Sequence, residues 1–594
     1  MTFRMLHLGL FAALLLPPAL TRAAPQSAGA APVSIRWLHS EDAAFKQARA
    51  ENKFVVLDLE AVWCHWCHVM DEMTYANPKV IAAMNQHYVA WRVDQDARPD
   101  LAQRYGDWGW PATIFFASDG TEIVKKRGYI PPEGMLQLLA AIVADPSPVT
   151  YAQEDEDAAP SASDSLSAGL RDELRKRYAA TFDAKQGGLD LSQKFLDHDS
   201  VEYALGLARN GAKDQAARAK LSLDKARALL DPAWGGFYQY STDNDWVHPH
   251  FEKLAALQGN HIRTYALGWA ALDHDPAYAK VVGSVMGYLD TFLRSPEGTF
   301  YASQDADLKP GVHSDKYFAQ GDAARRAQGI PRIDKHVYSS YNGTIIEGLA
   351  SWAELSGNKT ALKQAQTAAQ WILAHRAIDG GGFRHDEHDA TGPYLGDTLA
   401  MGRAFLALYR ADADRSWLEH SDAAAAYIEK HFRRADGGYF TAVSTGAKSV
   451  PVIEENIALA RWTNLLAYYS GNSNETAMAK HAMRWLNTKA AALHYATEPG
   501  ILLADRELAG PPLHLTVVGG KNDPHARTLF GALQALPPWY KRIDWWDRAQ
   551  GPLPNPDVQY PPVKRAAAFV CTNRRCSLPL YDVAGLQRFL AAGS

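Results

Sequence analysis

The sequence predicts a multidomain protein, in which an N-terminal α/β domain is followed by an all-α (α/α)6 toroid and a small mixed C-terminal segment. Apolar strands alternate with amphipathic helices between residues 38 and 144, which is typical of a layered α/β domain. Between residues 166 and 490, amphipathic helices recur in pairs, which is typical of a helical array. The length of 594 residues also exceeds what one hydrophobic core organises.

The composition is that of a globular protein without a nucleic-acid surface. Apolar residues make up 47% of the chain and charged residues 21%, and the net charge is only -5. A disordered chain would have fewer apolar residues, and a nucleic-acid-binding domain would be strongly basic. We therefore expect no nucleic-acid partner.

Residues 1–23 have the pattern of an export signal. Arg4 precedes an apolar run over residues 8–20, and small residues follow at the positions that a signal peptidase recognises. A membrane anchor is the alternative, but the run is shorter than the roughly 20 residues that a span needs and contains Pro17 and Pro18. We expect a periplasmic or secreted protein with no membrane contact after signal removal, in a compartment where cysteines can pair.

The α/β domain is expected over residues 33–144. Its expected elements are a charged helix at 41–51, strands at 54–59, 89–93 and 112–117, and an amphipathic helix at 133–143. Residues 145–165 are rich in Pro, Ser, Ala and acidic residues, so they cannot bury enough apolar surface to order themselves. We expect them to form a linker.

The toroid is expected over residues 166–495, followed by the mixed segment 496–594. Its expected helices include 251–273, 276–294, 342–356, 359–377, 396–413 and 417–432. Glycine-aromatic signatures such as Gly235-Gly236-Phe237 recur between them. Because one helix pair cannot bury its own apolar face, the pairs must stack on one another. We expect a closed ring rather than an open solenoid.

The segment Trp63-Cys64-His65-Trp66-Cys67-His68 has the pattern of a redox motif. It follows an apolar strand and opens a helix, so the two cysteines lie on one helix face within reach of a disulfide. Unpaired backbone N–H groups at the helix start stabilise a thiolate on the first cysteine. We therefore expect Cys64 to be the attacking thiol and Cys67 the resolving one.

Two further residues fit a thioredoxin-like site around these cysteines. Asp58 precedes Cys64 on the strand, at the place of the buried acid that moves protons during exchange in thioredoxins. Pro111 follows Trp110 directly before another strand, where a cis peptide bond would place it beside the sulfurs. Zinc binding by the cysteines and histidines, or a purely structural disulfide, are the alternatives. The redox hypothesis needs neither a metal nor a cofactor.

The chain has two more cysteines near its C-terminus. Cys571 and Cys576 close a short loop if their sulfurs pair, and the even count of four suits two internal disulfides. A structural disulfide is the expectation, and a shuttle toward Cys64 is the alternative.

The segment Cys64–Met70 (Cys-His-Trp-Cys-His-Val-Met), with the Trp-Pro pair, resembles the signature of the spermatogenesis-associated protein 20 family and its bacterial relatives. The resemblance continues in Pro249–Lys253 (Pro-His-Phe-Glu-Lys) and Asp305–Asp307 (Asp-Ala-Asp). It departs at Leu254–Leu257, where the family usually has Met-Leu-Tyr-Asp, so that an acid expected in the toroid is apolar here. The resemblance implies a thioredoxin-like domain joined to a six-hairpin glycosidase-like toroid.

The implied toroid is shared with sugar hydrolases and sugar 2-epimerases, whose polar groups lie in loops at one mouth. The corresponding loops hold six candidates for a substrate pocket: His248, His250, Glu252, Asp305, Asp307 and Asp397. Glu252 and Asp305 could supply the two carboxylates of glycoside hydrolysis. His248 or His250 could supply the acid and base of an epimerase. Alternatively, the acids only cap turns and helix starts.

Three functional hypotheses follow. The first is an exported thiol-disulfide oxidoreductase whose partners are protein thiols or disulfides. The second is a carbohydrate-active toroid, with the redox domain as its regulator. The third is a binding scaffold without catalysis, in which both parts recognise partners.

Overall fold

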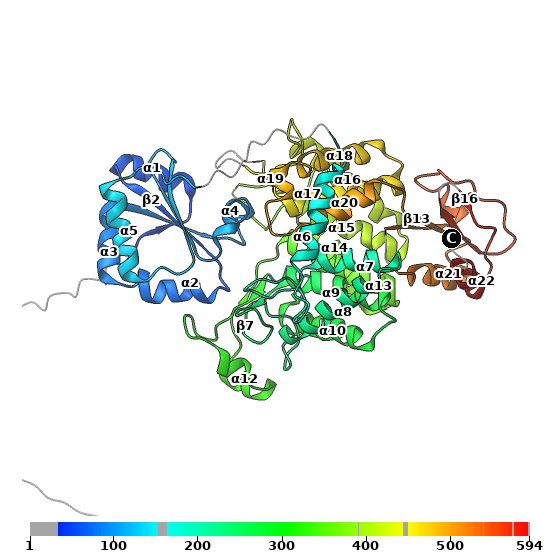
Figure 1. Cartoon of the computed structure of the whole chain (residues 1–594), viewed down its shortest axis with the longest axis horizontal. Helices are drawn as coiled ribbons and strands as arrows, with labels where there is room; N and C mark the ends of the chain where they lie inside the picture. Colours follow the sequence, from blue (N-terminus) through cyan, green and yellow to red (C-terminus); the bar gives the residue numbers. More distant parts are fainter. Residues whose placement is uncertain are drawn as a thin grey trace, which may run out of the picture.

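The computed structural model describes residues 34–151, 163–389, 391–443, 449–537, 540–572 and 575–591. The predicted export signal and residues 152–162 of the predicted linker lie outside these ranges. Three bodies follow one another along the long axis of the molecule, with the α/β domain at one end, the helical toroid in the middle and the C-terminal sheet at the other end (Figure 1).

The N-terminal domain has a thioredoxin-like fold. Its five-stranded sheet has the order β1-β3-β2-β4-β5, in which β1, β3 and β2 are parallel, β4 is antiparallel to β2, and β5 is antiparallel to β4. The strands are β1 (Trp37–Leu38), β2 (Phe54–Glu60), β3 (Tyr88–Asp94), β4 (Ala112–Phe116) and β5 (Glu122–Arg127). The helical elements are α1 (Glu41–Glu51), α2 (His65–Val69), η1 (Met70–Tyr75), α3 (Pro78–His87), α4 (Pro99–Tyr105), η2 (Gly106–Trp108) and α5 (Pro132–Ala144).

Side-chain alternation along β2 explains why helices cover both faces of this sheet. Val55 and Leu57 belong to one buried cluster, whereas Val56 belongs to another on the opposite face. Successive side chains of a strand point to opposite faces, so a strand that is apolar throughout must be covered twice.

Six helical hairpins form the toroid. Its main helices are α6 (Ala168–Ala180), α7 (His198–Arg209), α8 (Lys213–Ala226), α9 (Ala255–Ala271), α10 (Pro276–Tyr288), α13 (Ser339–Ser356), α14 (Lys359–His375), α15 (Leu395–Asp412), α16 (Arg415–His431), α17 (Ile453–Ser470), α18 (Ser473–Leu486) and α20 (Pro499–Leu508). Shorter elements connect them: η3 (Arg227–Leu229), β6 (Tyr240–Ser241), β7 (Pro249–His250), β8 (Lys253–Leu254), η4 (Leu289–Leu293), β9 (Ser303–Gln304), α11 (Asp315–Phe318), α12 (Asp322–Gln328), β10 (Ile333–Asp334), β11 (Ala377–Ile378), β12 (Gly382–Phe383) and α19 (Lys489–Ala492).

The inner helices form a closed ring, as predicted. Contacts run from α7 to α9, α13, α15, α17 and α20 in turn, and α20 contacts α7 again. An open solenoid would leave the first and last helices apart. Because α20 belongs to the ring, the helical array extends past the predicted boundary at residue 495.

Glycines allow the inner helices to approach closely. A Cβ atom on Gly348 of α13 would lie 2.4 Å from the carbonyl oxygen of Gly259 on α9. A Cβ atom on Gly343 would lie 2.7 Å from the backbone of Ala400 on α15. Both distances are far below van der Waals contact, so only glycine fits at these crossings.

The start of one predicted helix is wrong. The expected helix 251–273 begins only at Ala255, because Lys253 and Leu254 form β8, which pairs with β9. Glu252 therefore precedes a strand and does not occupy a helix start. The alternative in which Glu252 is a helix N-terminal residue is thereby wrong.

The C-terminal segment is a small sheet with the order β14-β13-β15-β16 and two helices. Its elements are β13 (Leu513–Val518), α21 (Pro524–Gln534), β14 (Lys541–Trp546), η5 (Arg548–Gln550), β15 (Ala567–Thr572), β16 (Arg575–Cys576) and α22 (Val583–Ala591). Lys541 forms an ion pair with Glu354 at 3.1 Å, and the hydroxyl of Tyr409 donates to Asp544 at 2.9 Å. The sheet thus covers the ring at the C-terminal ends of α13 and α15.

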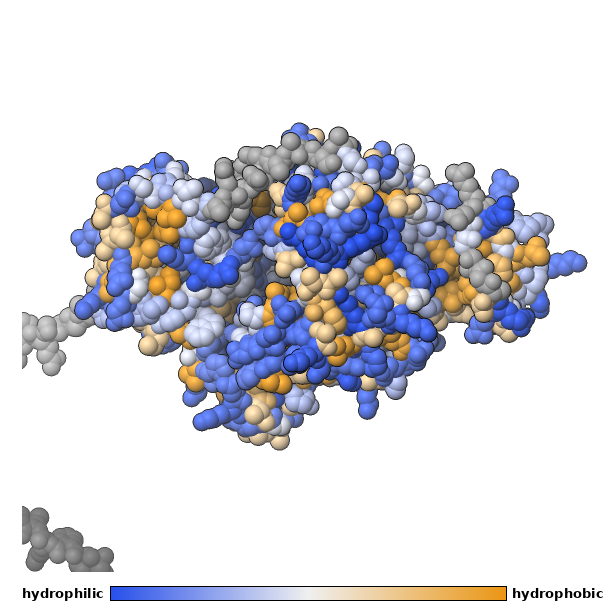
Figure 2. Space-filling view, in the orientation of Figure 1, coloured by the Kyte–Doolittle hydropathy of each residue, from blue (hydrophilic) through white to orange (hydrophobic). Residues whose placement is uncertain are grey.

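On the face seen in Figure 2, hydrophilic residues cover most of the toroid, with small apolar areas between them. On the same face, apolar residues gather over the α/β domain and toward the C-terminal end. In the part of the chain that the structure describes, no helix has both the length and the apolar character needed to cross a bilayer.

Candidate functional site

The structure joins Cys64 and Cys67 in a disulfide at the start of α2, with Cα atoms 5.3 Å apart. Cys64 is the N-cap residue, and its sulfur accepts the backbone N–H of Cys67 at 3.2 Å. Such N–H groups stabilise a negative charge on the sulfur once the disulfide is reduced. Both cysteines are buried, with only 5% and 3% of their surfaces exposed.

Asp58 and Pro111 both belong to the central strands of this domain or border them. Asp58 lies on β2 and is buried, and Arg92 donates to one of its carboxylate oxygens at 3.0 Å. Burial raises the pKa of Asp58 to about 6, although the charge of Arg92 opposes the shift. Pro111 directly precedes β4, and the Trp110-Pro111 peptide bond is cis. Trp110 packs against the buried cysteines.

The mouth of the toroid covers the disulfide. Leu254, which directly precedes α9, packs against the cluster that contains Trp63 and both cysteines. The backbone N–H of Ala306 also donates to the carbonyl oxygen of Trp63 at 3.3 Å. The redox motif therefore lies in the contact between the two domains.

Asp307 of the toroid binds both histidines of the redox motif. One carboxylate oxygen lies 2.8 Å from Nδ1 of His65, and the other lies 3.0 Å from Nδ1 of His68. Burial alone would lower the pKa of His68, but Asp307 and Asp305 raise it above its usual value. Burial alone would raise the pKa of Asp307, but the hydrogen bonds from the two histidines lower it. These opposite shifts indicate ion pairs across the domain contact.

A second polar junction is centred on Asp96, two residues after the end of β3. Its carboxylate accepts the indole N–H of Trp63 at 2.8 Å and the hydroxyl of Tyr341 at 2.6 Å. Its carbonyl oxygen lies 2.6 Å from Nε2 of His385. Nδ1 of His385 in turn lies 2.9 Å from Asp397. Burial alone would lower the pKa of His385, but the charge of Asp397 raises it to about 9, so this histidine is a cation at neutral pH.

Glu252 and Asp305 flank the paired strands β8 and β9 beside the redox motif. The register of β8 and β9 pairs Lys253 with Gln304, and its continuation places Glu252 opposite Asp305. Burial raises the pKa of Glu252 to about 8, with a further contribution from the charges of Asp305 and Asp307. Burial also raises the pKa of Asp305 to about 6. The two carboxylates thus have unequal proton affinities.

The remaining candidates lie apart from these carboxylates or only border them. His250 stacks on Tyr240 with ring centroids 4.3 Å apart, and its Nδ1 lies 3.7 Å from Glu252. His248 is exposed and pairs instead with Asp245 at 2.9 Å. Asp397 belongs to the junction with His385. The structure thus brings Glu252, Asp305 and Asp307 together with the cysteine loop, and leaves His248 outside.

Sequence reasoning missed the role of Asp96 and Tyr341. Asp96 lies two residues after the apolar strand that runs beside β2, so it lies at the same sheet edge as the cysteines. An acidic residue at that sheet edge is a sequence feature that could have identified Asp96 as a neighbour of the redox motif. Tyr341 gives no such signal, because its partner belongs to another domain.

Two groups of side chains have the composition of a metal site. The ligand atoms of His68, Asp305 and Asp307 all lie within 4.8 Å of one another, as do those of Asp58, Glu60 and Asp71. In the second group Arg92 forms ion pairs with all three carboxylates, so a cation already occupies the space between them.

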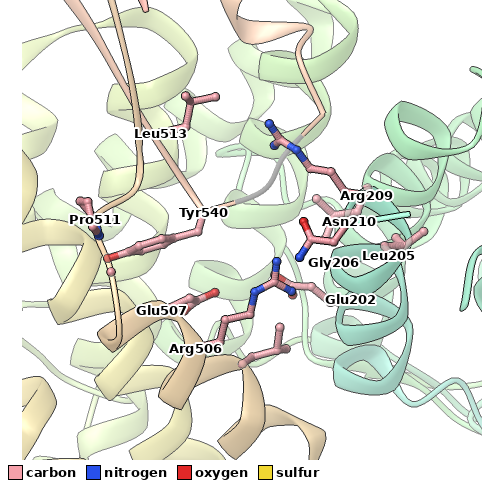
Figure 3. Close-up of a pocket in the computed structure, with 13 residues that line it drawn as sticks. Glu202, Leu205, Gly206, Arg209, Asn210, Arg506, Glu507, Pro511, Leu513 and Tyr540 are labelled. Atoms are coloured by element: carbon pink, nitrogen blue, oxygen red, sulfur yellow. The ribbon is translucent and has the colours of Figure 1, made fainter. Parts of the chain in front are cut away.

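Two cavities lie inside the toroid, away from the redox motif. One of about 480 Å³ is lined by ion pairs such as Arg263 with Glu202 and Arg403 with Glu347. The other, of about 350 Å³, opens beside the C-terminal segment, where Arg209 and Arg506 reach toward the same space and Tyr540 lies across from them (Figure 3). Among the described residues, none of the sequence-predicted site residues lines either cavity.

Cys571 and Cys576 form a disulfide between β15 and β16. The C-terminal sheet and the thioredoxin-like domain lie at opposite ends of the molecule (Figure 1). This arrangement fits a structural disulfide and not a shuttle toward Cys64.

Comparison with known proteins gives matches to each part. Residues 24–164 match the family model Thioredox_DsbH, described as a protein of unknown function, DUF255. Human spermatogenesis-associated protein 20 is 25% identical over 316 residues, which are 46% of this chain and 39% of the human protein. The thiol:disulfide interchange protein DsbD of Campylobacter jejuni is 26% identical over 109 residues, which are 18% of this chain and 19% of DsbD.

Among solved structures, cellobiose 2-epimerase from Bacillus thermoamylovorans aligns with a TM-score of 0.42 at 10% identity, over 54% of this chain and 86% of the epimerase. The chain matches only about two fifths of the length of spermatogenesis-associated protein 20. The chain is therefore a homologue of spermatogenesis-associated protein 20 over about half of its own length, with a thioredoxin-like domain joined to a helical toroid.

Proposed function

We propose that the protein is an exported thiol-disulfide oxidoreductase that uses Cys64 and Cys67. The observation that carries this proposal is the position of Cys64 as N-cap of α2, where its sulfur accepts the N–H of Cys67. This contact lowers the energy of the attacking thiolate. The similarity to a protein named for thiol:disulfide interchange supports the same chemistry.

The exchange runs in two steps. In the reduced protein, the Cys64 thiolate attacks a substrate disulfide, forms a mixed disulfide and releases one substrate thiolate, which takes up a proton. Cys67 then loses its proton and attacks the Cys64 sulfur. The second substrate thiolate leaves, the substrate is reduced to a dithiol, and Cys64 and Cys67 become a disulfide.

Asp58 is the base for the second step. Its pKa of about 6 means that it is mostly ionised at neutral pH and can accept the Cys67 proton. Among the described residues, its Oδ1 oxygen has no hydrogen-bond partner of good geometry, so it is available for a proton.

The described conformation is the closed form of this enzyme. A protein disulfide cannot reach sulfurs that are buried in a cluster against which Leu254 of the toroid packs. Exchange with a protein therefore requires the toroid mouth to separate from the redox motif. That motion breaks the hydrogen bonds of Asp307 with His65 and His68 and those around Asp96.

Trapping of mixed disulfides tests the proposal. The Cys67→Ser variant lacks the resolving thiol, so we expect it to accumulate a mixed disulfide at Cys64 with a disulfide-bonded protein such as oxidised insulin. The Cys64→Ser variant is the matched control and should trap nothing. Equal trapping by both variants would place the reactive thiol elsewhere and refute the assignment.

A carbohydrate-active toroid is the second candidate, favoured by one observation. The register of β8 and β9 places Glu252 opposite Asp305, and their pKa values are about 8 and 6. Glycoside hydrolysis requires such a pair, in which one carboxyl group donates a proton and the other acts as a carboxylate. Because the thioredoxin-like domain covers Glu252 and Asp305, a sugar could enter only after domain separation. Calorimetric titration of the reduced protein with mannose and cellobiose tests this, and heat that Glu252→Gln abolishes would support it.

A further inference from the structure

The contact between the domains contains buried carboxylates that have few positively charged partners. Within the described part of the chain, the ion pairs of Glu252, Asp305 and Asp307 are all with histidines. All three carboxylates are at most 4% exposed. Buried carboxylates need a nearby cation, or they must take up protons.

His68, on the thioredoxin-like side of the contact, has more oxygen neighbours than a neutral imidazole can donate protons to. Its Nδ1 lies 3.0 Å from a carboxylate oxygen of Asp307. Its Nε2 lies 3.2 Å from the carbonyl oxygen of Val62 and 3.6 Å from Asp305. Both ring nitrogens thus face oxygen atoms, whereas a neutral imidazole carries only one N–H. One nitrogen therefore requires an added proton or a metal ion.

Glu252 provides an independent observation. Within the described residues, its Oε2 oxygen has no hydrogen-bond partner, and the residue is only 3% exposed. The continued register of β8 and β9 places it opposite Asp305. A buried carboxylate oxygen without a donor, within the electrostatic influence of Asp305 and Asp307, favours a cation at this contact.

We propose that a divalent zinc ion binds at this contact, held by His68, Asp305 and Asp307, with the buried Glu252 carboxylate as its neighbour. Zinc takes four ligands from imidazole nitrogens and carboxylate oxygens at about 2.0–2.2 Å. The ligand atoms of His68, Asp305 and Asp307 already lie within 4.8 Å of one another. The Val62 carbonyl accepts the Nε2 proton of His68 and so leaves Nδ1 free for the metal, as is usual for metal-bound histidines.

The ion would bridge the two domains. His68 belongs to α2 and follows the resolving Cys67 directly, whereas the three carboxylates belong to the toroid. Zinc binding would thus stabilise the contact in which the toroid mouth covers the disulfide. Zinc binding can be measured in the oxidised protein, so its test does not depend on the proposed redox activity.

Calorimetric titration of the metal-free, oxidised full-length protein without a histidine tag, using zinc chloride, tests the site. The intact disulfides exclude binding by cysteine thiolates. We expect one zinc ion per chain and a loss of affinity of about tenfold or more in Asp305→Asn and in Glu252→Gln. Glu252→Gln removes charge at an oxygen that has no hydrogen bond to lose, so it should fold normally, as thermal unfolding will verify.

Asp243→Asn, which alters an exposed carboxylate near His248, is the matched control and should bind zinc as the native protein does. Absence of zinc binding by the native chain would overturn the inference. Unchanged binding by both Asp305→Asn and Glu252→Gln would overturn it as well.

Discussion

At the scale of single residues, the redox motif combines groups that act on sulfur with groups that hold the motif against the toroid. Cys64, Cys67 and Asp58 serve the proposed exchange, whereas His65 and His68 contact Asp307 of the toroid. Neighbouring residues of one short segment therefore serve different purposes.

Asp58→Asn should slow the resolution of mixed disulfides by about tenfold or more at pH 7, because the base for Cys67 is lost. Asp71→Asn is a suitable control, since Asp71 also pairs with Arg92 but is more exposed. Stopped-flow oxidation of the reduced protein by oxidised glutathione measures the rate. The rate of the native protein should also fall as the pH decreases through about 6. Equal rates for Asp58→Asn and the native protein would exclude Asp58 as the base.

The stability that His385 contributes should depend on pH. Its pKa rises from 6.5 in the unfolded chain to about 9 in the folded protein. The contribution is therefore fully present below pH 6.5 and is lost as the pH rises through 9. Unfolding by urea should show that His385→Asn costs on the order of 3 kcal/mol more at pH 6 than at pH 10. A cost that is independent of pH would contradict the ion pair with Asp397.

The residues of the redox motif could be predicted because the residues that they act with are close to them in the sequence. Cys64 and Cys67 lie on the first turn of one helix, and Asp58 lies on the strand that precedes this helix. The contact of Asp96 with Tyr341 could not be predicted in this way, because it depends on how two separately folding parts meet. The same reason explains why Glu252 and Asp305 were predicted as sugar-pocket residues and not as neighbours of the cysteines.

At the scale of elements, hydrophobic periodicity predicted the helix pairs and the central strands. It placed the helix near Glu252 too early, because residues 253 and 254 form a short strand whose partner, β9, is distant in sequence. Short strands of this kind depend on their partner and carry no periodic signal of their own. Ring closure also involves α20, which follows the predicted end of the toroid.

The close crossing of α9 and α13 gives a test at this scale. Gly348→Ala places a Cβ atom 2.4 Å from the Gly259 carbonyl oxygen, so we expect a destabilisation of about 1–3 kcal/mol or more. Gly283→Ala in the outer helix α10 is the control, because no atom lies within 4 Å of the added Cβ. Thermal unfolding of both variants measures the difference. A similar melting temperature for the two would show that the inner ring is less tightly packed than described.

At the scale of the whole molecule, both ends of the helical ring are covered. The thioredoxin-like domain lies over the end from which α9, α13 and α15 begin, and the C-terminal sheet covers the other (Figure 1). The proposed redox chemistry therefore depends on an equilibrium between closed and open arrangements of the domains.

Weakening this contact should expose the disulfide. Asp307→Asn removes the carboxylate charge shared by His65 and His68, so we expect reduction by dithiothreitol to be about tenfold faster, with a chelator present throughout. Asp315→Asn, an exposed carboxylate in the same region, should react at the native rate. Thiol trapping followed by mass spectrometry gives both rates. Unchanged reduction in Asp307→Asn would mean that this contact does not limit access.

The central claim is that Cys64 and Cys67 form an exchanging dithiol, and its reduction potential tests this most directly. The protein with Cys571→Ser and Cys576→Ser would be equilibrated with a series of glutathione ratios, and the free thiols trapped and counted by mass spectrometry. We predict a reversible transition between about -120 and -270 mV, the range of known exchange proteins. A pair that stays oxidised below about -300 mV would be a structural disulfide and would contradict the account.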